Sequence, residues 1–277
     1  MKTFPSFDGK VCVVTGAASG IGRAVAIALA ASGARLALTD INSDELDKTV
    51  EMIGGANQHK VDVMDMADAQ AIAAYAPDVE AALGPADYVF NIAGLSRFGD
   101  FRNTPAESFE KVMDVNFYGM VRMSKAFLEQ LIKTKGGLVN VSSIYGIIGV
   151  PGQAHYCASK FGIRGFSEAL SLEMLDYGVT VTSVHPGGVK TNVVRNGEVD
   201  SLAHIGTTKD SLIENFDKNA ARTSAEDAAT IILDGTERKK LLVLVGGDAT
   251  FVQRLTRLFP VRYRNFVMKR QARITGR

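Results

Sequence analysis

The chain has 277 residues, of which 46% are hydrophobic and 22% are charged, and its formal net charge is +1. This composition predicts a globular protein with an ample apolar core and excludes a disordered or fibrous chain. The sequence contains no run of about 18 uncharged apolar residues, so we expect no membrane span, and its N-terminus lacks the apolar stretch of a signal peptide. Two cysteines, Cys12 and Cys157, make no disulfide framework and favour a reducing, cytoplasmic compartment.

The first predicted strand, residues 10–15, runs into a glycine-rich turn and then into an alanine-rich helix that stops near Gly33. Glycines at such a turn let backbone N–H groups approach a pyrophosphate at the positive end of a helix. The spacing is G-x-x-x-G-x-G and not the commoner G-x-G-x-x-G. The alternative is a tight turn without a ligand. The predicted phosphate-binding residues are Gly16, Ser19, Gly20, Ile21 and Gly22.

The second predicted strand ends at Asp40, 18 residues beyond Gly22. This distance is close to the roughly 20 residues expected for a carboxylate that binds a ribose. A carboxylate there accepts hydrogen bonds from both ribose hydroxyls and repels a 2′-phosphate, and the next residue is Ile41, not a cation. These features favour NAD over NADP. The alternative is that Asp40 caps the following helix together with Asn42 or Ser43.

Strands and helices continue to alternate along the chain. We predict further strands at residues 59–63, 87–91, 137–141, 179–184 and 241–245, and helices at 65–83, 104–133, 154–177 and 225–238, the second of these capped by Thr104. Alternation of this kind predicts a parallel sheet with right-handed crossovers in one α/β domain, residues 1–247. The polar, weakly periodic stretch within about 188–222 is expected to form a mobile substrate lid.

The chemistry is expected where the strand at 137–141 ends. Ser143 follows this strand, at the kind of strand end where α/β proteins place their active sites. Tyr156 and Lys160 are four residues apart and so share one face of a helix. A nearby ammonium is expected to lower the pKa of a phenol from about 10 towards the working pH, which suits proton exchange with an alcohol or carbonyl. Taken alone, the pair also fits an ordinary amphipathic helix.

Several motifs agree in order and spacing, and together they closely resemble the short-chain dehydrogenase/reductase family over about residues 8–247. The motifs are Thr15-Gly-Ala-Ala-Ser-Gly-Ile-Gly22, Asp62-Val63, Asn91-Ile-Ala-Gly94, Asn116, Ser143, Tyr156-x-x-x-Lys160 and Pro186-Gly187. One departure is Ile92, where the family usually has a second asparagine.

The resemblance implies a Rossmann-type doubly wound sheet of seven parallel strands in the order 3-2-1-4-5-6-7. It also implies a catalytic tetrad of Asn116, Ser143, Tyr156 and Lys160. Tyr156 would be the general acid/base, and Ser143 would bind the substrate oxygen with it. Lys160 would bind the nicotinamide ribose and lower the pKa of Tyr156, and the Asn116 backbone would hold a water of a proton relay. The alternatives are that Asn116 marks a helix kink and that Ser143 caps a turn.

The implied cofactor is NAD, with NADP less favoured, and no metal is expected. Beyond the glycine turn, Asp40, Tyr156 and Lys160, the implied cofactor-binding residues are Asp62, Val63, Asn91, Ala93, Gly94, Val189 and Thr191. The implied activity interconverts a secondary alcohol and its carbonyl compound, and the uncharged loop at 146–153 favours an apolar substrate. The alternatives are a non-catalytic NAD-binding scaffold or regulator and an epimerase or dehydratase. The resemblance also implies a homodimer or homotetramer.

Residues 248–277 form a basic amphipathic extension beyond the family resemblance. Eight of the 31 basic residues but none of the 30 acidic ones lie in 251–277. Apolar residues from Phe251 to Phe259 recur at helical spacing before Pro260 breaks the pattern. The stripe is expected either to pack on the domain or a partner subunit, or to contact a membrane surface peripherally. Binding of nucleic acid is not expected.

Overall fold

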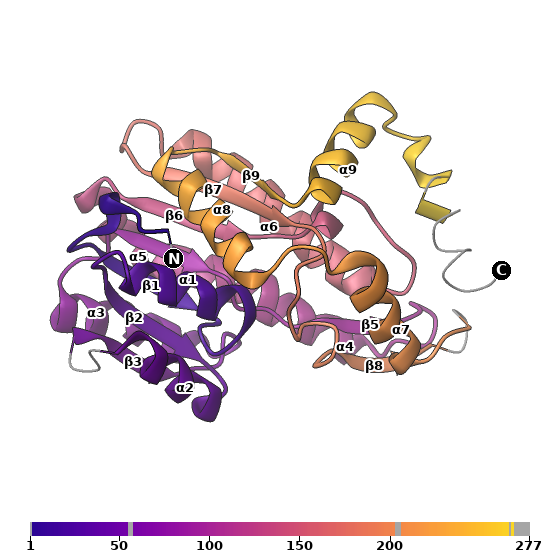
Figure 1. Ribbon diagram of the computed structural model, residues 1–277, viewed down its shortest axis with the longest axis horizontal. Helices are drawn as coiled ribbons and strands as arrows, with labels where there is room; N and C mark the ends of the chain where they lie inside the picture. The colour runs from indigo at the N-terminus through magenta and orange to yellow at the C-terminus, as the bar shows by residue number, and fades with distance from the viewer. Residues whose placement is uncertain (1, 55–57, 203–205, 266, 269–277) are drawn as a thin grey trace.

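The computed structural model describes residues 2–54, 58–202, 206–265 and 267–268 (Figure 1). Within this part of the chain, seven parallel strands form a sheet in the order β3-β2-β1-β4-β6-β7-β9. Their bounds are β1 Val11–Thr15, β2 Arg35–Asp40, β3 Lys60–Val63, β4 Tyr88–Asn91, β6 Gly137–Val141, β7 Thr180–Pro186 and β9 Leu242–Val245. β5 and β8 belong to a separate sheet, so the strands of the main sheet, counted along the chain, lie in the predicted order 3-2-1-4-5-6-7. The doubly wound, single-domain α/β fold is therefore confirmed.

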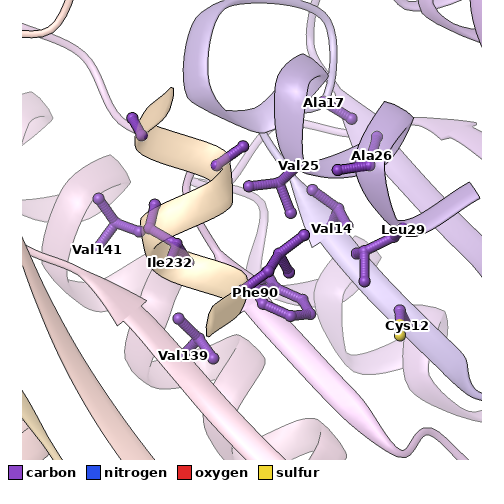
Figure 2. Packing of buried hydrophobic residues seen from close by; sticks show 14 of the residues in the cluster. Cys12, Val14, Ala17, Val25, Ala26, Leu29, Phe90, Val139, Val141 and Ile232 are labelled. Carbon is purple, nitrogen blue, oxygen red and sulfur yellow. The ribbon is translucent and has the colours of Figure 1, made fainter. Parts of the chain in front are cut away.

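Helices cover both faces of the sheet. The α-helices of the described chain are α1 Gly20–Ala30, α2 Ser43–Ile53, α3 Ala69–Leu83, α4 Ala106–Met113, α5 Gly119–Thr134, α6 Ala154–Glu173, α7 Lys209–Asn215, α8 Ala225–Glu237 and α9 Gly247–Leu258. On one face, Val25 of α1 and Ile232 of α8 pack with Val14 and Phe90 of the strands (Figure 2). On the other face, α3, α5 and the end of α6 contribute a second buried cluster. None of the described helices has the length and apolar content that crossing a bilayer requires.

The helix predicted at 104–133 is divided by a π-helical segment, Asp114–Tyr118, that lies between α4 and α5. The predicted cap by Thr104 is wrong. Pro105 occupies the N-cap position, and the Thr104 hydroxyl donates instead to the Asp100 carbonyl at 2.8 Å. This local hydrogen bond closes the preceding turn and leaves the hydroxyl turned away from the first helical N–H groups.

The predicted lid has secondary structure of its own. It contains β8 (Glu198–Ser201), α7 and a π-helical turn, Phe216–Ala220. β8 pairs in parallel with β5 (Arg97–Gly99) to form a second, two-stranded sheet. An ion pair between Arg97 Nη2 and Asp200 Oδ1 at 2.7 Å joins the two strands, with the two side chains only 16% and 4% exposed. The lid is therefore anchored to the loop that follows β4.

Candidate active site

The carboxyl ends of the parallel strands border a cavity of about 780 Å³. This edge of an open α/β sheet is where such folds bind ligands, and the volume lies within the usual range for ligand sites. The wall combines elements far apart in the sequence: the glycine turn, Asp40, residues 92–94, Ser143, Tyr156, Lys160, residues 186–189 and 191–194, and part of the C-terminal segment. Most of the predicted site residues therefore border one continuous space.

The glycine turn makes a close backbone approach that only glycine permits. A Cβ on Gly22 would lie 1.9 Å from the Gly16 carbonyl oxygen, and Gly16 itself has a φ of +71°. The N-cap residue of α1 is Ser19, whose side chain makes no capping hydrogen bond. The N-terminus of α1 therefore faces the cavity with its partial positive charge available to an anion. Thr191 closes over this turn, since a Cβ on Gly20 would lie 3.0 Å from its methyl carbon.

Asp40 lies at the end of β2, beside the glycine turn. Its Oδ2 accepts a hydrogen bond from the Ala18 backbone N–H at 3.0 Å, and its Oδ1 accepts one from the Asn42 N–H at 3.0 Å. The N-cap of α2 is Asn42, which accepts from the Glu45 N–H at 3.1 Å. Asp40 is therefore held against the glycine turn and is not the cap of α2.

Three predicted cofactor residues lie outside the cavity wall. The Asn91 amide is buried beneath the sheet, where its Nδ2 donates to Asn140 Oδ1 at 2.9 Å. Asp62 and Val63 lie at the end of β3, and the adjoining wall is formed by residues 64–66. Asp62 accepts from Lys60 Nζ at 2.8 Å, and its other carboxylate oxygen is buried without a hydrogen-bond partner among the described residues. The prediction that Asn91 lines the cleft is therefore wrong for its side chain.

Asn116 lies in the π-helical segment and is 1% exposed. Its Oδ1 accepts from the Leu95 N–H at 2.8 Å, and its Nδ2 donates to the Leu95 carbonyl at 3.0 Å and to Ser159 Oγ at 3.2 Å. The side chain thus ties the loop after β4 to α6. A π-helical turn offsets the backbone hydrogen bonds, and such turns are frequent at functional sites.

Ser143 follows β6 and starts a 3₁₀ turn, in which its Oγ accepts from the Tyr145 N–H at 3.1 Å. The Ser143 carbonyl is hydrogen-bonded to His185 Nδ1 at 3.0 Å. His185 is completely buried on β7, and its Nε2 lies 2.9 Å from Ser183 Oγ. Burial lowers the pKa of His185 to about 4, so the ring is neutral at pH 7. Sequence reasoning missed this support of Ser143 because a single histidine carries no motif.

Tyr156 and Lys160 both border the cavity from α6. Lys160 Nζ donates to the Val141 carbonyl at 3.0 Å and lies 5.5 Å from the centroid of the Tyr156 ring. Desolvation raises the pKa of Tyr156, although the side chain retains some contact with the cavity, and the Ser143 hydroxyl partly lowers it. Burial lowers the pKa of Lys160 to about 8. The predicted lowering of the Tyr156 pKa is wrong, because desolvation of the phenol is the largest influence on this pKa and raises it.

The C-terminal segment, described at residues 247–265 and 267–268, is also part of the site. Asp248 at the start of α9 accepts from the Gly188 N–H at 2.8 Å, which joins α9 to the loop after β7. This loop carries Val189, which is 4% exposed. Four apolar side chains of the segment line the cavity: Val252, Leu255, Tyr263 and Val267. The sequence left open whether the helical stripe packs on the domain or a partner subunit or contacts a membrane, and the structure places Val252 and Leu255 of this stripe on the cavity wall.

A protein-family model described as short chain dehydrogenase matches residues 10–201. The chain is 42% identical over 266 residues to the putative oxidoreductase SadH of Mycobacterium tuberculosis strain H37Rv, with 95% of each chain covered. It is 34% identical over 242 residues to dehydrogenase/reductase SDR family member 7B of Mus musculus, with 85% of this chain and 72% of that protein covered.

Solved structures share the fold. A short-chain dehydrogenase from Mycobacterium paratuberculosis bound to NAD superposes with a TM-score of 0.76 at 27% identity, covering 88% of this chain and 99% of that one. Levodione reductase superposes with a TM-score of 0.75 at 26% identity over the same shares. With the ordered motifs, the sheet order and these relatives together, the chain belongs to the short-chain dehydrogenase/reductase family of oxidoreductases.

Proposed function

We propose that this protein is an NAD(H)-dependent oxidoreductase that interconverts an apolar secondary alcohol and its ketone or aldehyde. The observation that carries the proposal is the convergence of two groups of residues on one cavity. Asp40 and the glycine turn border one part of it, and Ser143, Tyr156 and Lys160 border another. A dinucleotide is long enough to contact both groups when its reactive ring lies beside the substrate.

The chain's own residues supply binding, orientation and one proton. Tyr156 exchanges a proton with the substrate oxygen, and the Ser143 hydroxyl binds the same oxygen. The raised pKa of Tyr156 keeps its phenol protonated at neutral pH, so that the phenol can donate a proton to a carbonyl oxygen. Lys160 binds the ribose next to the nicotinamide, and Asn116 keeps the loop after β4 against α6. When bound, the cofactor supplies or accepts the hydride.

The glycine turn and Asp40 fit a nicotinamide dinucleotide. The Gly16 carbonyl oxygen packs where a Gly22 Cβ would lie, and this tight turn leaves the backbone at the start of α1 on the cavity wall, which supports binding of a pyrophosphate there. The Asp40 carboxylate supports a ribose with a free 2′-hydroxyl and therefore NAD over NADP. Among the described residues of the cavity wall, the cations are Lys111 and Lys160. Lys111 pairs with Glu198 and Lys160 with the Val141 carbonyl, so neither is placed for a 2′-phosphate beside Asp40.

The cavity wall beside the proposed chemistry favours an apolar substrate. Ile148, Val150 and Pro151 line the wall from the loop after β6. Val252 and Leu255 line it from α9. Enclosure by side chains of this kind favours a hydrocarbon body over a sugar phosphate or hydroxy acid, whose charges would lose water without gaining a partner.

We also propose that the protein is a cytoplasmic homodimer or homotetramer. Exposed apolar side chains at the end of α6 and in the turn after it support a subunit interface. Leu172 is 67% exposed, Leu175 63% and Tyr177 52%. Light scattering of the purified protein measures the assembly, and a monomeric mass at micromolar concentration contradicts this part of the proposal.

The first test measures binding of NADH and NADPH in parallel, by protein fluorescence and thermal shift. We expect tighter binding of NADH. A screen of apolar secondary alcohols with NAD, and of the matching ketones with NADH, then tests turnover. Binding without turnover of any alcohol or ketone would favour a non-catalytic NAD-binding protein. Absence of binding to either nucleotide would contradict the proposed function as a whole.

A further inference from the structure

The C-terminal segment has an inner and an outer face with different surroundings. The inner face packs against the loop after β6, where Val252 joins Ile147 and Ile148 in a buried cluster that also contacts Tyr263. It also contributes to the wall of the cavity. Packing of the inner face therefore covers part of the apolar stripe that the sequence displays, namely Val252 and Leu255. The outer face has no such packing among the described residues.

The outer face exposes an unusual amount of apolar surface over a short length of chain. Four side chains on it are exposed: Leu258 by 73%, Phe259 by 47%, Val261 by 69% and Met268 by 56%. Single exposed apolar residues are common on soluble proteins, but a contiguous group marks an interaction surface. In Figure 1, α9 and the turn after it stand at the outside of the molecule, away from the β2 and β3 edge of the sheet.

The same face is basic. Arg254 lies one helical turn before Leu258, so the two side chains are neighbours on α9. Arg257, Arg262 and Arg264 are also exposed. None of these four arginines makes an ion pair within the described part of the chain. The sequence contains no acidic residue after Asp248.

We infer that the outer face of the C-terminal segment docks on an anionic membrane surface. Negatively charged headgroups complement the four arginines, and the region just below the headgroups receives Leu258, Phe259 and Val261. A second copy of this chain fits less well, because a two-fold interface sets each patch against its own copy and brings like charges together. The inner face of the docked segment then lies at the cavity, so an apolar substrate dissolved in the bilayer enters there. Entry of a substrate from the bilayer rests on the proposed function, whereas docking of the outer face on a membrane does not.

The test is co-sedimentation of the full chain with vesicles of phosphatidylcholine alone and of phosphatidylcholine with phosphatidylglycerol. We expect binding to the anionic vesicles that falls as salt is raised. Leu258→Glu should lower the partition coefficient about tenfold or more, since it removes an inserted side chain and adds a repelled charge. The matched control is Met52→Glu on α2, where the native side chain is 59% exposed, and it should leave binding unchanged. Thermal unfolding checks that both variants fold.

Absence of binding to the anionic vesicles would overturn the inference, as would equal binding by Leu258→Glu and the unaltered chain. Equal loss of binding in the Met52→Glu control would show a general charge effect and would also overturn it. Light scattering tests the alternative, in which a second copy of this chain covers the outer face. If Leu258→Glu dissociates an oligomer and leaves lipid binding unchanged, a second copy covers this face. These readouts measure lipid binding and mass, so they stand or fail separately from turnover.

Discussion

Acid should destabilise this protein through His185, and the structure sets the size of the effect. The ring of this β7 residue is completely buried, with hydrogen bonds to the Ser143 carbonyl and the Ser183 hydroxyl. Burial lowers its pKa from 6.5 to about 4 in the folded protein. The unfolded chain keeps a pKa near 6.5. The two states therefore bind a proton at different pH values.

The sign of the effect follows from that difference. Above pH 6.5 the ring is neutral in both states and contributes no dependence on pH. As the pH falls below 6.5, the unfolded chain gains a proton that the folded protein does not bind, so stability is lost. Each pH unit in this window costs about 1.4 kcal/mol, and by pH 4 the loss is about 3 kcal/mol.

The assay compares the protein with His185→Gln, which removes the titrating ring and keeps a neutral amide. Urea unfolding at pH 7 and pH 4 should show that the unaltered protein loses about 3 kcal/mol more than the variant across this interval. Carboxylates and other histidines titrate in both proteins, so their contributions cancel in the difference. An equal loss of stability in both proteins would refute the reasoning, because it would mean that the buried ring accepts a proton without cost.

Four further predictions concern the site. Tyr156→Phe should abolish turnover and leave NADH binding within about twofold, as measured by fluorescence titration; loss of NADH binding would mean that Tyr156 is structural. Because the pKa of Tyr156 is raised, the fraction of Tyr156 in the basic form should grow from pH 7 to pH 9, and the rate of alcohol oxidation by the unaltered protein should rise with it. A rate that does not change across that range would contradict Tyr156 as the base. Asp40→Asn should narrow the preference for NADH over NADPH about tenfold in parallel titrations, and an unchanged ratio would show that the carboxylate does not face the ribose. Gly22→Ala should destabilise the fold by about 1–3 kcal/mol and weaken NADH binding, since the new Cβ would lie 1.9 Å from the Gly16 carbonyl oxygen. The control is Gly165→Ala, whose Cβ meets nothing within 4 Å, and thermal unfolding should show it to be neutral or slightly stabilising.

The features that could be predicted from the sequence are those set by local order and spacing. Alternating strands and helices led directly to the parallel sheet, because each crossover is short and has one favoured hand. The glycine turn was recognisable because only glycine tolerates the approach at Gly22. Tyr156 and Lys160 could be assigned to one face because four residues make about one helical turn. In each case the informative residues are neighbours along the chain.

The features that were missed depend on residues far apart in the sequence. β5 and β8 are too short to show a periodic pattern, and the ion pair that joins them connects Arg97 and Asp200, which are 103 residues apart. The direction of the Asn91 amide was decided by Asn140 on the neighbouring strand.

By itself, then, the sequence determined the order of the elements, the glycine turn and the spacing of Tyr156 and Lys160, because hydrophobic period and backbone sterics act over a few residues. Only the tertiary structure decided the pKa of Tyr156 and the position of the C-terminal segment. Desolvation adds contributions from every segment packed around a group, so the spacing from Lys160 does not predict the pKa of Tyr156. The stripe on α9 could pack on any apolar surface, and its Val252 and Leu255 pack at the rim of the cavity, whereas Leu258 stays exposed.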